Sequence, residues 1–241
     1  MLLKTRGIVF RSIKYGDTSV IADIYTREEG LRTFIIGGVR KQKSNFSPGL
    51  LQVMSIVDLV AYFKVDRDMH RVKEMIPAQI FSGISYDVIK SSVGLFMIEV
   101  AQKSIKESEQ NYRLFDFLEQ SFLLLDTTKN SLANFPIGFL LRLSNYLGFQ
   151  PERFRDPEDV FFDLKEGHFV SKTIGHTYFL SEEQTELLWN FLALDLTEIH
   201  ELKIDRSQRK LLIKELIQFY RFHVEQLQEI RSLDVLETIL S

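Results

Sequence analysis

The chain has 241 residues, of which 45% are hydrophobic and 26% charged, as in folded globular proteins of one large or two to three small domains. It contains no cysteine, which excludes disulfides, thiolate catalysis and cysteine-ligated zinc or iron–sulfur centres. No apolar run reaches the roughly 18 residues that a membrane span needs. Lys4 and Arg6 interrupt the apolar N-terminal stretch, so neither a signal peptide nor a membrane anchor is expected. We expect a soluble, cytoplasmic protein that makes no membrane contact.

The charge is unevenly distributed along the chain. The formal net charge is -3, but residues 1–79 hold 13 Lys/Arg and 8 Asp/Glu, a net +5, which leaves -8 for the remainder. A basic N-terminal part can bind a polyanion by neutralising phosphates and releasing counterions, even where the whole chain is acidic. Chance scatter of charges is the alternative interpretation.

Residues 1–79 have the pattern of a small β-barrel. Short runs rich in β-branched and aromatic residues alternate with glycine turns at near-regular spacing. The strands are expected at residues 7–11, 19–25, 31–36, 52–63 and 71–76. Five strands in about 75 residues fit an OB-type barrel, whose closure removes most exposed edges. The expected fold class is α+β, with an OB-fold barrel domain at 1–79 followed by a helical domain at 80–241.

Residues 80–241 are predominantly helical in pattern. Apolar residues recur at helical spacing over 93–104, 114–125 and 139–147, each giving one apolar helix face. An irregular insert at about 150–180 contains a predicted β-hairpin, with strands at 160–164 and 168–172. A capping box at Ser181–Gln184 predicts a helix to about residue 194. A long helix is expected at about 207–230, and a short helix from Ser232.

Catalytic and metal-binding motifs are not found in the sequence. There is no phosphate-binding glycine loop, no nucleophile elbow and no familiar histidine ligand spacing. His168 and His176 are eight residues apart with Asp163 nearby, so a metal site can be imagined there, but surface or hairpin histidines are far commoner. His223 lies on an apolar helix stripe and is interpreted as a packed core residue, not a base. We therefore expect no enzymatic activity, no cofactor and no metal.

A basic loop between two predicted strands suggests a nucleic-acid surface. It places Arg40, Lys41 and Lys43 close to the aromatic Phe46, and flexible cations of this kind can follow phosphates. Phe46 could stack on a base or dock inward as the anchor of the loop. Further cations at strands and turns are Arg11, Lys14 and Arg32, although these cannot all share one face.

Four segments resemble the RecO family of bacterial recombination proteins, in the same order along the chain. The N-terminal GIVFRSIKYGDTSVIADIYTREEG resembles the start of that family, and GGVRKQKSNFSPGLLQ resembles its basic loop. FLLRLSNYLGF resembles a helix that ends in L-G-Y/F, and FYRFHVEQLQEIRSLDVL resembles the C-terminal segment of the family. The matches cover nearly the full chain.

The resemblance implies a non-enzymatic DNA-binding function. RecO proteins have an N-terminal OB-fold and a helical domain, and they bind single- and double-stranded DNA and anneal complementary strands. With RecR, and in some settings RecF, they help to load RecA onto DNA coated by single-strand-binding protein (SSB). They also bind the acidic, Phe-ended C-terminal tail of SSB. The resemblance implies DNA contacts by Arg40, Lys41 and Lys43, a tail site at Phe139 and Arg142, and association with the nucleoid.

Two departures from the family pattern bear on these expectations. The cysteines of the zinc-binding insert that many members carry are missing from residues 150–180, so this chain is expected to use the hairpin without metal. Ile137 and Gly138 stand where basic residues would support the tail site, and Phe139 as a core residue beside a solvated Arg142 is the alternative. Two other functions stay open: a scaffold whose barrel binds protein, and a nuclease with a site of scattered Asp and Glu.

Overall fold

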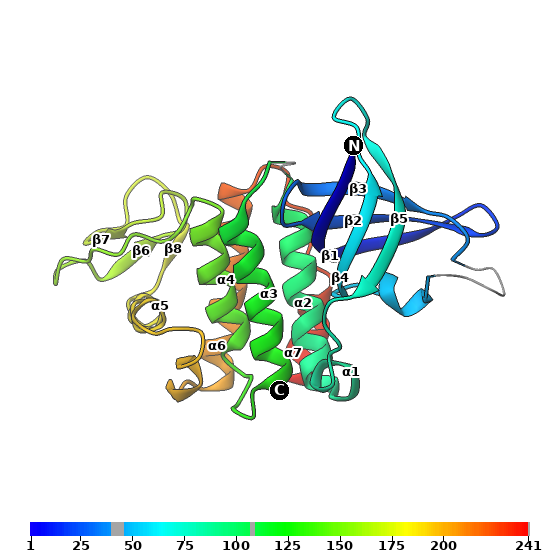
Figure 1. The fold of residues 1–241 in the computed structure, drawn as a ribbon. Helices are drawn as coiled ribbons and strands as arrows, with labels where there is room; N and C mark the ends of the chain where they lie inside the picture. Colours follow the sequence, from blue (N-terminus) through cyan, green and yellow to red (C-terminus); the bar gives the residue numbers. More distant parts are fainter. Residues whose placement is uncertain (40–45, 107–108, 241) are drawn as a thin grey trace. The chain divides into compact units, whose positions relative to one another are not determined.

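The computed structural model describes residues 1–39, 46–106 and 109–240 (Figure 1). The basic residues Arg40, Lys41 and Lys43 lie outside this described part. The chain forms two compact units, Met1–Thr127 and Thr128–Ser241, and each is described by itself.

The first unit contains a closed five-stranded barrel with the strand order β1-β2-β3-β5-β4. Neighbouring strands are antiparallel except β3 and β5, which are parallel. The strands are β1 (Leu2–Tyr15), β2 (Ser19–Thr26), β3 (Gly30–Ile36), β4 (Ile56–Tyr62) and β5 (Met69–Pro77). The predicted OB-type barrel is confirmed. The 3-10 helix η1 (Pro48–Leu51) precedes the fourth strand, which starts later than predicted because residues 52–55 form a turn in which Met54 has a φ of 75°.

The barrel interior follows from strand alternation, which sends every second side chain inward. The buried cluster includes Val9 of β1, Ala22 and Ile24 of β2, and Phe34 and Ile36 of β3. Residues between these positions face outward. This two-residue period decides which functional groups can share the outer surface.

Three helices complete the first unit: α1 (Gly83–Tyr86), α2 (Val88–Ser104) and α3 (Tyr112–Thr127). Phe115 of α3 stacks on Tyr25 of the barrel with ring centroids 6.1 Å apart, and Tyr25 stacks on Phe10 at 5.5 Å. Two arginines of the barrel also bind α3, Arg6 through Glu119 at 3.1 Å and Arg27 through Asp116 at 2.9 Å. These contacts hold α3 to the barrel within the compact unit Met1–Thr127.

Asp126, at the end of α3, fixes the start of α1. Its buried carboxylate accepts backbone hydrogen bonds from Gly83 and Ile84, both at 2.7 Å, and from Ser82 at 3.3 Å. Position 83 requires glycine, because an added Cβ would lie 2.2 Å from the Asp126 carbonyl oxygen.

The second unit combines helices with a small sheet. The helices are α4 (Phe135–Tyr146), α5 (Glu182–Ala193), α6 (Arg206–His223) and α7 (Ser232–Ile239), with the 3-10 helix η2 (Ile199–Glu201). The sheet has the order β7-β6-β8, with strands β6 (Phe161–Asp163), β7 (Phe169–Val170) and β8 (Phe179–Leu180). The predicted hairpin corresponds to β6 and β7, and the predicted capping box at Ser181 is present. The third strand, β8, was not predicted.

Helix α6 ends at His223, seven residues before the expected end, which corrects the prediction of a helix to about residue 230. Val224 has extended backbone angles and Gln226 adopts a left-handed conformation with φ of 51°. No glycine or proline marks this turn in the sequence. His223 itself stacks on Phe149 with ring centroids 5.4 Å apart, and burial lowers its pKa, in agreement with a packed histidine.

Candidate nucleic-acid interface

A β-bulge in β1 determines which residues of the N-terminal hairpin face outward. Val9 pairs with Ile24, but the next aligned pair is Arg11 with Asp23, so Phe10 is an extra residue on β1. A bulge of this kind shifts side-chain alternation by one position. Val9 therefore faces the barrel core, whereas Arg11 and the second residues after it, Ile13 and Tyr15, face outward.

These residues continue across four strands as one outer face. Ile13 is aligned with Ile21 of β2, Ile21 with Ile35 of β3, and Ile35 with Arg71 of β5. The adjacent row aligns Arg11 with Asp23, Thr33 and Met69, and Tyr15 is aligned with Ser19. We call this face the outer platform: Arg11, Ile13, Tyr15, Ser19, Ile21, Asp23, Thr33, Ile35, Met69 and Arg71.

The outer platform combines accessible apolar groups with cations at both edges. Tyr15, Ile13 and Met69 expose 53%, 42% and 40% of their surface. Arg11 and Arg71 are exposed on opposite edges, and neither makes a hydrogen bond or ion pair within the described part of the chain. Aromatic and aliphatic groups between cations are what a single nucleic-acid strand requires, because its bases stack and its phosphates seek positive charge.

The other predicted DNA-binding residues are placed differently. Lys14 is exposed but faces the same side of β1 as Val20, away from Arg11. Arg32 is aligned with the core residue Ile24 and lies outside the platform. Its side chain is 22% exposed, bonds Glu29 at 3.5 Å and lies over the Phe63 ring at 5.9 Å. These two cations are therefore not brought together with Arg11.

Phe46 packs, half-buried, against the barrel core, which favours the inward-anchor interpretation over base stacking. The neighbouring Val39 is also buried. The two residues that flank the basic segment, Val39 and Phe46, thus both pack against the barrel.

Of the platform residues, sequence reasoning identified Arg11 alone, and it missed Tyr15 and Arg71 in particular. Tyr15 lay outside the expected strands, and Arg71 began an expected strand without a functional role. Neither a motif nor local charge density singles out these positions. Only the register of four strands shows that they share a face, and that register depends on the bulge at Phe10.

The predicted SSB-tail residues lie in α4 of the second unit. Phe139 is fully buried, so it cannot contact a peptide from this position and instead forms part of the helical core. The Arg142 side chain is 14% exposed and lies 4.0 Å from Asp195, and burial lowers its pKa. This geometry offers no apolar groove with Phe139 on its surface.

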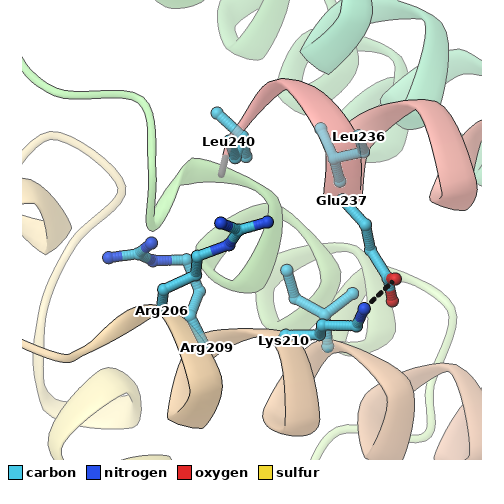
Figure 2. A pocket seen from close by; sticks show the side chains of 7 residues that line it. Arg206, Arg209, Lys210, Leu236, Glu237 and Leu240 are labelled. Carbon is cyan, nitrogen blue, oxygen red and sulfur yellow. Dashed lines mark ion pairs between the residues drawn. The ribbon is translucent and has the colours of Figure 1, made fainter.

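A different surface of the second unit has a cationic rim beside apolar groups (Figure 2). This hollow, which we call the α6–α7 groove, is shallow and open to solvent, with about 20 Å³ of space for the centre of a water-sized molecule. Its lining consists of Arg206, Arg209, Lys210, Ile213, Leu236, Glu237 and Leu240.

The cations of the α6–α7 groove differ in whether a neighbouring group already binds them. Lys210 bonds Glu237 at 2.8 Å, the ion pair drawn in Figure 2. Arg209 bonds the Asn134 side chain at 3.1 Å and the Ile204 carbonyl oxygen at 3.0 Å. Arg206 is exposed and has no partner within the described part of the chain. The groove therefore offers one available guanidinium beside an apolar floor.

Asp163 makes the polar contacts that hold the turn of the hairpin in the second unit. Asp163 lies 3.3 Å from His176 and accepts backbone hydrogen bonds from Lys165 and Glu166. Over residues 1–39, 46–106 and 109–240, no three or more His, Cys, Asp or Glu side chains are grouped to hold a metal ion. Over the same ranges, no helix has the length and apolar character to cross a membrane.

Comparisons with known proteins cover the whole chain. The family described as Recombination protein O N terminal matches residues 1–81, and Recombination protein O C terminal matches residues 85–233. A curated relative named DNA repair protein RecO from Phocaeicola vulgatus is 33% identical over 100% of both chains. Relatives of the same name from Bacteroides fragilis and Christiangramia forsetii are 31% and 32% identical over 99% of each chain. The chain therefore belongs to the RecO family of DNA repair proteins.

Proposed function

We propose that this protein is a recombination mediator that binds single- and double-stranded DNA, anneals complementary strands and, with RecR, helps to load RecA onto SSB-coated DNA. It acts by binding and catalyses no reaction. The proposal rests on the outer platform. Its apolar row, Ile13, Ile21 and Ile35, ends at Arg71, and the adjacent row begins with Arg11. Membership in the RecO family supports the roles of RecR, RecA and RecF.

The chemistry of the platform fits DNA better than it fits protein. Unpaired bases can stack on Tyr15 and lie over Ile13, Ile21 and Ile35, while Arg11 and Arg71 neutralise phosphates. Neutralised phosphates repel a second strand less, so a complementary strand can approach the held one. A duplex, whose bases are stacked inside, is limited to the phosphate contacts. Binding of single strands should therefore be tighter than binding of duplex.

The salt dependence of single-strand binding tests the proposal. We expect log Kd for an oligonucleotide to rise steeply with log salt concentration, and Arg11→Gln/Arg71→Gln to reduce that slope by about 1.4, at about 0.7 per lost phosphate contact. The matched control Lys165→Gln/Lys172→Gln removes two exposed cations from the second unit and should leave the slope unchanged.

Two outcomes of this titration would contradict the proposal. A flat salt response would favour the scaffold alternative, in which the barrel binds protein. Equal slopes for the double variant and the wild type, with the fold intact by circular dichroism, would remove the outer platform from the DNA site. Divalent-dependent cleavage of the oligonucleotide would support the nuclease alternative.

The α6–α7 groove is the better candidate for the SSB tail. An acidic peptide that ends in phenylalanine needs a cation next to an apolar hollow, and Arg206 beside Leu236 and Leu240 meets both needs. We expect Arg206→Glu to weaken binding of a fluorescent tail peptide at least ten-fold while DNA binding is kept. If Arg142→Glu abolished peptide binding and Arg206→Glu did not, the tail would instead bind at α4.

A further inference from the structure

The outer platform contains one acidic residue, Asp23, whose position is unexpected on a surface that binds a polyanion. Its carboxylate is half-buried and accepts a hydrogen bond from the Thr33 hydroxyl at 2.8 Å. Arg11 is the residue directly opposite in the strand pairing, yet the two side chains form no ion pair within the described part of the chain. The acidic group is therefore oriented by Thr33 and not neutralised by Arg11.

Asp23 lies next to the apolar row on which bases would rest. Ile21 is two residues from Asp23 on β2. On β3, the residues aligned with these two, Ile35 and Thr33, are also two residues apart. Two residues of a strand span about 6.6–6.8 Å. A base lying over Ile21 and Ile35 can thus present its edge to the Asp23 carboxylate.

A carboxylate accepts hydrogen bonds and cannot donate them. Among the DNA bases, guanine alone presents two adjacent donors on its pairing edge, the N1–H and the N2 amino group. Among the residues that the structure describes, one oxygen of Asp23 has no partner, and the other, bonded to Thr33, keeps a second lone pair for another donor. The pairing edge is available only when the guanine is unpaired.

We propose that Asp23 binds the pairing edge of unpaired guanine and that Thr33 is its positioning residue, so that the outer platform prefers single strands containing guanine. This inference rests on the proposed DNA-binding function. The contrasting account is that Asp23 only offsets the charge of Arg11, and in that case its removal would strengthen binding of every strand equally.

Three oligonucleotides of equal length distinguish these accounts, with binding to the full-length protein measured by fluorescence anisotropy at one salt concentration. They are all-thymine, alternating guanine–thymine, and alternating inosine–thymine. Inosine keeps the N1–H of guanine but lacks the N2 amino group. We expect the guanine strand to bind about five-fold more tightly than the thymine strand, the lower end for a bidentate base contact, and the inosine strand to fall between them.

Two variants test whether Asp23 and Thr33 cause the preference for guanine. Asp23→Asn should abolish the guanine preference and tighten binding of the thymine strand, because a negative charge is lost. Thr33→Val keeps shape and charge, so it should reduce the guanine preference without changing thymine binding. The matched control Asp66→Asn removes an exposed charge from the β4–β5 turn and should keep the preference of the wild type.

The outcomes separate this inference from the proposed function. Equal affinities of the wild type for all three strands, or a guanine preference that survives in both Asp23→Asn and Thr33→Val, would overturn the guanine contact alone. Binding to none of the strands would overturn the DNA-binding function itself. If Asp23→Asn fails to fold, as judged by its thermal unfolding curve, Thr33→Val decides the question.

Discussion

Replacing Tyr15 with alanine tests whether the outer platform stacks bases. Tyr15 exposes 53% of its surface at the end of β1, so its removal should change folding stability by less than about 0.5 kcal/mol. Stacking of a base on an aromatic ring contributes about 1–3 kcal/mol. Because the protein already covers about half of the Tyr15 residue, we take the lower half of that range. About 1.4 kcal/mol corresponds to a ten-fold weaker Kd.

The assay is a titration with single-stranded oligonucleotide at several salt concentrations. Tyr15→Ala removes no positive charge, so it should weaken binding at every salt concentration and leave the slope unchanged, whereas loss of a platform arginine lowers the slope. Tyr15→Phe should bind like the wild type. Tyr86→Ala, which removes a 90% exposed tyrosine outside the platform, is the control. Unchanged affinity of Tyr15→Ala would refute base stacking at this position.

The remaining predictions concern the basic loop and the stability of the first unit. The triple variant Arg40→Ala/Lys41→Ala/Lys43→Ala should weaken DNA binding across sequences and lower the salt slope, and an unchanged slope would remove this loop from the site. Asp126→Ala should lower the free energy of unfolding in urea by about 3 kcal/mol, because it leaves backbone N–H groups near α1 without acceptors; a loss below about 1 kcal/mol would contradict that account. Burial, together with the charge of Arg32, lowers the pKa of His70, so the unfolded state binds more protons and stability should fall as the pH drops below about 6.5. His70→Phe should weaken that pH dependence, and the same dependence in variant and wild type would exclude His70 as its source.

The barrel was predictable because its local signals agree with one another. Alternating β-branched residues and glycine turns mark β2 and β3 almost to the residue, and the turn at Gly30 has the positive φ of 65° that favours glycine. The capping box at Ser181 likewise placed α5 correctly, since its two reciprocal hydrogen bonds are encoded within four residues. Such features need only short-range information.

The candidate site was only partly predictable because it depends on long-range register. Arg11 was identified from its charge, but its partners Tyr15 and Arg71 share a face with it only through pairings that bring separate strands together. Sequence periodicity gave Phe139 an apolar helix face without showing that the ring is completely enclosed. The end of α6 at His223 has no breaker residue in the sequence, so periodicity alone extended that helix too far.

The bulge at Phe10 makes the platform dependent on the number of residues as well as on their identity. If β1 paired with β2 one residue to one from Val9 onward, Phe10 would lie opposite Asp23 and Arg11 opposite the core residue Ala22, so that the guanidinium and the phenol of Tyr15 would turn to the core side. A point mutation in the same stretch removes one contact and leaves the others in place. Loss of Phe10 itself would leave Arg11 opposite Asp23 on the outer face, whereas loss of Ser12 together with the bulge would place Arg11 opposite Ala22 on the core side. The position of a one-residue deletion in this stretch therefore decides whether the platform keeps its cation.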